Sequence, residues 1–82
     1  MKAGEVIKEV EGLTHDKLTY FIRGEYIKPK RTKRGSLYYN DFSYSDLEII
    51  KRAWKYISQD MKTRSAFERA IKEVKNPQLN FL

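Results

Sequence analysis

Residues that interrupt regular helices are spread along the chain and divide its 82 residues into short segments. These residues are Gly12, Gly24, Pro29, Gly35 and Pro77. Glycine commonly follows the last turn of a helix and proline cannot continue one, so each position marks an expected element boundary. Between most of them, apolar residues recur at the i, i+3, i+4 spacing of amphipathic helices. The sequence therefore predicts a single, mainly α-helical domain.

The first two predicted helices are short and close together. Apolar spacing places the first over Glu5–Glu11, and the second follows Thr14 and ends near Arg23. The Thr14 hydroxyl is expected to cap the second helix by accepting a hydrogen bond from a free backbone N–H. Two short helices joined by Gly12-Leu13-Thr14 are typical of a helix–turn–helix.

Two further helices are predicted in the second half of the chain. The longest carries the apolar series Tyr44–Ile57, with Asn40 as its expected cap and Asp41 in its first turn. Thr63 is expected to cap the last helix, which ends at Asn76-Pro77. The predicted core consists of Leu18, Phe21, Ile27, Leu47, Ile50, Trp54, Ile57, Phe67 and Ile71.

Positive charge is concentrated in one segment. Seventeen Lys and Arg residues outnumber 11 Asp and Glu residues, which gives a net charge of +6. The segment Lys28–Arg34 contains five basic and no acidic residues, and its Pro29 and following Gly35 predict an exposed loop. Lys28–Arg31 and Ser36–Tyr39 are expected to form a small two-stranded hairpin. The predicted fold is thus a winged helix–turn–helix with about four helices and a basic hairpin wing, for which nucleic acid is the favoured partner.

Composition argues against several other functions. The chain has no cysteine and one histidine, which excludes disulfides, thiolate zinc sites and sites with several histidines. No apolar run approaches the roughly 20 residues of a membrane span, and the N-terminus lacks a signal-peptide pattern. We therefore expect a cytoplasmic protein with no membrane association, cofactor or metal. No nucleophile–base set is visible, so an enzyme is not expected.

The residues from Gly12 to Ile50 resemble, in order and without a gap, the winged helix–turn–helix domain of the MerR (mercury-resistance regulator) family. In that family a Gly-apolar-Ser/Thr turn is followed by Leu-Arg-Tyr-Tyr, by Leu-Leu-x-Pro at the start of the wing, and by Gly-Tyr-Arg-x-Tyr within it. The corresponding residues here are Gly12-Leu13-Thr14, Leu18-Thr19-Tyr20-Phe21, Tyr26-Ile27-Lys28-Pro29, and Gly35 with Tyr39.

The chain also departs from that family. Thr19 and Leu37 replace arginines, and the glycine expected after Ile57 is missing. The resemblance implies a long dimerising helix and an effector domain, but here Pro77 follows the fourth predicted helix. Residues 1–76 are accordingly expected to form the DNA-binding domain and residues 77–82 a short tail, without a coiled-coil dimer element. The chain is either an isolated domain of a longer protein or a naturally short relative.

The resemblance and the charge distribution together imply a DNA-binding set. The second helix is expected to enter the major groove of double-stranded DNA, and the wing to contact phosphates. Asp16 is interpreted mainly as a helix-start residue. The candidate DNA-binding residues are Thr14, His15, Lys17, Thr19, Tyr20, Arg23, Lys28, Lys30, Arg31, Lys33, Arg34 and Tyr38.

Two functions are expected from these features. The first is sequence-specific double-stranded DNA binding, as a transcription regulator or its isolated DNA-binding domain. The alternative is a protein–protein adaptor on the same fold, similar to modulators of chaperones, in which DNA binding is absent. A protein partner or the transcription machinery is compatible with either function.

Overall fold

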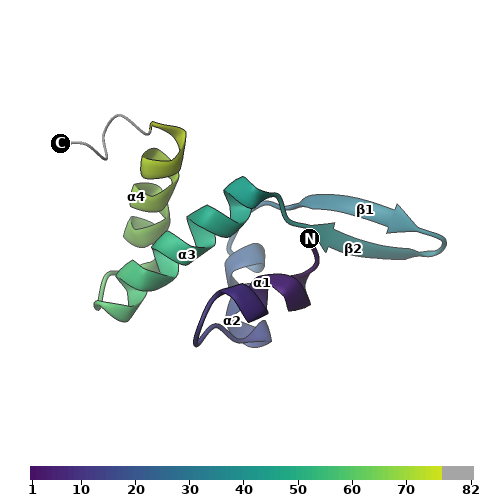
Figure 1. Cartoon of the computed structure of the whole chain (residues 1–82), viewed down its shortest axis with the longest axis horizontal. Coiled ribbons are helices and arrows are strands. Elements are labelled where there is room, and N and C mark those ends of the chain that lie inside the picture. Colours follow the sequence, from purple (N-terminus) through teal and green to yellow (C-terminus); the bar gives the residue numbers. More distant parts are fainter. Residues whose placement is uncertain (77–82) are drawn as a thin grey trace.

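The computed structural model describes residues 1–76, so the predicted tail at 77–82 lies outside the described residues. Figure 1 shows a group of packed helices from which a two-stranded hairpin projects. This arrangement confirms the predicted fold class. The elements are α1 (Ala3–Glu9), α2 (His15–Arg23), β1 (Lys30–Arg34), β2 (Leu37–Asp41), α3 (Tyr44–Ser58) and α4 (Thr63–Lys75).

The turn between α1 and α2 is fixed to α3. Gly12 has φ +84°, a left-handed conformation that glycine adopts without steric cost. The indole Nε1 of Trp54 in α3 donates to the carbonyl oxygen of Glu11 at 3.0 Å. The predicted cap of α2 is confirmed, because Thr14 Oγ1 accepts from the backbone N–H of Lys17 at 3.2 Å. α1 begins and ends two residues earlier than predicted, and the side chain of Glu5 accepts from the N–H of Lys2 ahead of it.

The hairpin places more of the chain in strands than the sequence predicted. β1 and β2 pair antiparallel, with Lys30 opposite Asp41 and Arg34 opposite Leu37. The two-residue connection begins with Gly35 at φ +63°, as the first position of a type II′ turn requires. β1 therefore begins two residues later than the predicted strand Lys28–Arg31 and continues to Arg34, so the expectation of a loop was wrong for residues 32–34. It is nevertheless exposed at Lys30, Arg31, Lys33 and Arg34.

The predicted cap of α3 was also wrong. Ser43, not Asn40, caps the helix: Ser43 Oγ accepts from the N–H of Asp46 at 3.0 Å, and Asp46 Oδ2 accepts from the N–H of Ser43 at 2.9 Å. This reciprocal pair is a capping box. Asn40 and Asp41 extend β2 instead, and the Asp41 carboxylate accepts from the N-terminal amine of Met1 at 2.8 Å.

The core lies among the four helices and the segments that join them. Phe21 of α2 is its centre, with its ring centroid 4.9 Å from that of Phe67 in α4 and 6.2 Å from that of Trp54 in α3. Of the predicted core residues, three are only partly buried where they pack against it: Trp54, Ile57 and Ile71. The prediction missed several buried residues: Val6, Val10, Leu13, Phe42, Ile49, Ala53, Ala66 and Ala70.

The fourth helix begins one residue away from its predicted cap. Thr63 is the first helical residue and Lys62 holds the cap position without a side-chain hydrogen bond. The predicted end is confirmed, since the helix stops at Lys75 and Asn76 follows it. None of the helices in residues 1–76 combines the length and the apolar character needed to cross a membrane.

Candidate nucleic-acid interface

All twelve residues predicted to bind DNA are exposed, and they lie at the N-cap of α2, on α2, on the hairpin, or on the segment joining α2 to the hairpin. On α2, Leu18 and Phe21 are each 2% exposed and define the buried side of the helix. At 100° per residue, the opposite side is centred on Asp16, Tyr20 and Arg23. This side of α2 is the surface on which a groove-binding helix would present its readout residues.

Asp16 occupies the first turn of α2, as its interpretation as a helix-start residue predicts. It is exposed at the middle of the outward side of α2, in the first turn. Tyr20 beside it is 50% exposed, and Lys17 Nζ lies 5.9 Å from the centroid of the Tyr20 ring. The Asp16 carboxylate can accept a hydrogen bond from the amino group of cytosine and repels phosphate.

The segment between α2 and the hairpin is fixed by aromatic packing. The Tyr26 ring stacks on Phe67 of α4, with centroids 5.6 Å apart and planes inclined by 22°. A Cβ at Gly24 would lie 2.5 Å from that Tyr26 ring, so glycine is needed at this close approach. Ile27 is buried and Lys28 is exposed. The segment that leads into the hairpin is therefore fixed against the helices.

The strand register divides the hairpin side chains between two faces, because residues directly opposite one another in an antiparallel pair project to the same side. We call the side with Arg31, Lys33, Tyr38 and Asn40 the outer face, and the side with Lys30, Thr32, Arg34, Leu37, Tyr39 and Asp41 the inner face. The predicted wing cations are thus split between two surfaces.

The outer face holds two cations around one exposed aromatic ring. Tyr38 is 58% exposed, with Arg31 Cζ 5.3 Å and Lys33 Nζ 5.8 Å from its ring centroid. Cations at such distances are attracted to the negative face of an aromatic ring. Arg31, Lys33 and Tyr38 therefore form one compact cationic cluster.

The inner face is turned toward the start of the chain. Lys2 Nζ lies 5.3 Å from the Tyr39 ring centroid, and Asp41 is held by the Met1 amine. That hydrogen bond is the main reason that the Asp41 pKa lies below its ordinary value, and the charge of Lys30 lowers it further. Within residues 1–76, no hydrogen bond, ion pair or ring contact joins the hairpin cations to the residues of α2.

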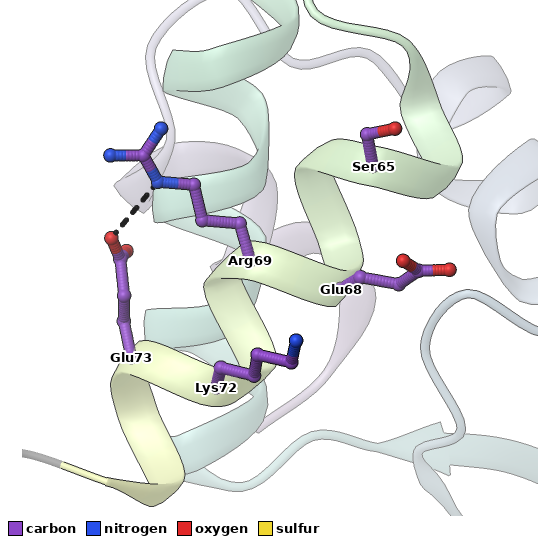
Figure 2. A pocket seen from close by; sticks show the side chains of 5 residues that line it. All are labelled: Ser65, Glu68, Arg69, Lys72 and Glu73. Carbon is purple, nitrogen blue, oxygen red and sulfur yellow. Dashed lines mark hydrogen bonds and ion pairs between the residues drawn. The ribbon is translucent and has the colours of Figure 1, made fainter. Parts of the chain in front are cut away.

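A second polar cluster lies on α4, at a shallow hollow lined by Ser65, Glu68, Arg69, Lys72 and Glu73 (Figure 2). Arg69 Nε and Arg52 each approach Glu73 at 3.4 Å. The Tyr56 hydroxyl lies 2.7 Å and 2.5 Å from the two carboxylate oxygens of Glu73. This hydrogen bond is the main cause of a lowered Glu73 pKa and a raised Tyr56 pKa. The contacts of Glu73 with Arg52 and Tyr56 link α4 to α3.

The described part of the chain contains no group of three or more side chains able to hold a metal ion. Comparison with protein-family models, with curated proteins and with solved structures finds no match to this chain.

Proposed function

We propose that the chain binds double-stranded DNA sequence-specifically, as a winged helix–turn–helix domain of the MerR type that regulates transcription. The single observation that carries the proposal is the basic hairpin, which projects from the helices beside a helix–turn–helix (Figure 1). Its four strand cations are all exposed. The resemblance to the MerR family over Gly12–Ile50 supports the same conclusion.

The charge of the hairpin suits the phosphate backbone. Lys and Arg side chains that neutralise phosphates release condensed counterions, which supplies most of the affinity for DNA of any sequence. The hairpin is anchored at its base by the buried Ile27 and by Tyr26 against Phe67. A fixed base limits the entropy lost when the cations engage the backbone.

The outward side of α2 supplies side chains that can read bases. Asp16, Thr19, Tyr20 and Arg23 offer hydrogen-bond donors and acceptors without contributing to the core. The helix is fixed by Leu18 and Phe21, which are buried in the core, and by its Thr14 cap. In this proposal α2 contacts base edges in the major groove and the hairpin holds the flanking backbone.

Fluorescence anisotropy with a labelled mixed-sequence duplex tests DNA binding directly. We expect binding at about 50 mM salt that weakens steeply as salt rises, because each phosphate contact contributes about 0.9 to the slope of log affinity against log salt. Selection from random duplexes should then enrich a defined half-site. Absence of binding at low salt would contradict the proposal and favour the adaptor function, for which exposed Leu37 and Tyr44, 73% and 81% accessible, offer apolar contacts.

A further inference from the structure

We infer that only the outer face of the hairpin, formed around Arg31, Lys33 and Tyr38, binds the sugar–phosphate backbone of duplex DNA, and that Lys30 and Arg34 do not contribute comparably. This inference rests on the proposed function and assigns its backbone contacts to one of two surfaces. Charge alone does not separate them, since each face carries one Lys and one Arg on β1.

The first argument is the electrostatic difference between the faces. The outer face carries Arg31 and Lys33 with the neutral Tyr38 and Asn40 opposite them. On the inner face the Asp41 carboxylate lies directly opposite Lys30. A neighbouring carboxylate competes with phosphate for a cation. The outer face contains no acidic residue that could compete in this way, whereas on the inner face Asp41 lies beside Lys30 and is paired with the Met1 amine.

The second argument is access. Thr32 and Tyr39, which are opposite each other on the inner face, are only partly exposed, whereas the opposed pair Lys33 and Tyr38 on the outer face is exposed. Lys2 and the Met1 amine contact the inner face near its base. A backbone approaching that face would have to displace these contacts. Among the described residues, no hydrogen bond, ion pair or ring contact from outside the hairpin reaches Arg31, Lys33 or Tyr38.

The third argument is the arrangement of the cations. Arg31 and Lys33 both lie beside the Tyr38 ring, at 5.3 Å and 5.8 Å from its centroid. Residues two apart on one strand are separated by about 6.6 Å, close to the spacing of successive phosphates along one DNA strand. The ring therefore acts as a positioning residue that holds two cations ready for neighbouring phosphates, and its own edge is free to pack on a deoxyribose.

Two double variants with matched charge changes test the inference. Arg31→Gln with Lys33→Gln removes the outer pair, and Lys30→Gln with Arg34→Gln removes the inner pair from the same strand. With a mixed-sequence 25-bp duplex, we expect the outer variant to lose about 2 units of salt slope and at least about tenfold in affinity at low salt. The inner variant should change affinity less than about threefold. Far-UV circular dichroism and the thermal midpoint establish that both are folded.

Three additional variants test the positioning role and show whether a loss of binding comes from misfolding. The swap Arg31→Lys with Lys33→Arg keeps both charges and should bind like the parent. Tyr38→Phe should keep parental affinity, whereas Tyr38→Ala should lose about fivefold. Equal losses in the two double variants, or a larger loss in the inner one, would overturn the inference while leaving DNA binding intact. A parent that does not bind the duplex would instead overturn the proposed function and the inference with it.

Discussion

Asp16 is the only acidic residue in α2, so under the proposed function it is the side chain of this helix that would repel phosphate. If α2 enters a groove, the carboxylate lies among phosphates and opposes binding to DNA of any sequence. We expect Asp16→Asn to raise affinity for mixed-sequence duplex about three- to tenfold at low salt. Asp60→Asn makes the same charge change in the α3–α4 turn and should have little effect. Equal gains from both would show that net charge, not position, is responsible.

Glu25 has φ 60°, a left-handed conformation that costs a residue with a Cβ about 1–2 kcal/mol. Replacement by glycine removes this strain but increases the entropy of the unfolded chain. Glu25→Gly is therefore expected to stabilise the protein by about 0.5–1 kcal/mol in urea denaturation. The adjacent Gly24→Ala should do the opposite, by about 1–3 kcal/mol, because its Cβ would meet the Tyr26 ring at 2.5 Å. A destabilised Glu25→Gly variant would contradict this reading of the turn.

At the scale of elements, α3 and α4 are joined by Glu73, whose side chain is 17% exposed and accepts from Tyr56. The pKa of Glu73 is lowered in the fold, so its contribution to the free energy of unfolding is complete above the ordinary value of 4.5 and is lost as pH falls through the lowered value. The pKa of Tyr56 is raised in the fold, so its contribution to the free energy of unfolding is complete below the ordinary value of 10.0. This contribution is lost as pH rises through the raised value.

Glu73→Gln is expected to cost about 1–3 kcal/mol near pH 7 and to flatten the decline in stability below pH 4.5. Glu68→Gln, an exposed change on the same helix, is the control and should leave the pH profile unaltered. Denaturation by urea at pH values from 3 to 7 measures both variants. An acid limb that persists in Glu73→Gln would assign the pH dependence to other carboxylates.

The elements that were predicted correctly depend on local signals. The Thr14 cap, the end of α2 before Gly24 and the apolar series of α3 follow from side-chain chemistry or periodicity within a few residues. The cap of α3 was missed because Asn40 and Ser43 are both good cap residues. The choice between them depends on distant contacts, as Asp41 is held in β2 by Lys30 across the strand pair and by the Met1 amine.

In the candidate site too, local signals predict some features, whereas others depend on distant contacts. Exposure of the twelve residues could be predicted because periodicity and charge indicate which positions avoid the core. The separation of Arg31 and Lys33 from Lys30 and Arg34 could not, because it depends on the register set by the Gly35 turn. A slip of one residue would exchange the two faces. A basic strand such as Lys30–Arg34 has weak intrinsic strand preference, so pairing with β2 determines its conformation.

At the scale of the whole molecule, Phe21 connects α2 to both helices of the second half of the chain. Its ring contacts Trp54 of α3 and Phe67 of α4, and the Trp54 indole holds the turn before α2. We therefore expect one cooperative unfolding transition, in which fluorescence of the sole tryptophan and helical circular dichroism change together in urea.

Phe21→Leu tests this coupling, because it weakens packing among three helices at once. The loss is expected to be about 1 kcal/mol. With a urea dependence of about 1–2 kcal/mol per molar for a small domain, both midpoints should fall together by about 0.5–1 M. A fluorescence transition that separates from the circular dichroism transition would show that α3 and α4 fold independently of the helix–turn–helix. In that case, the DNA binding proposed for α2 would require DNA itself to fix the position of this helix, and binding would include a folding step.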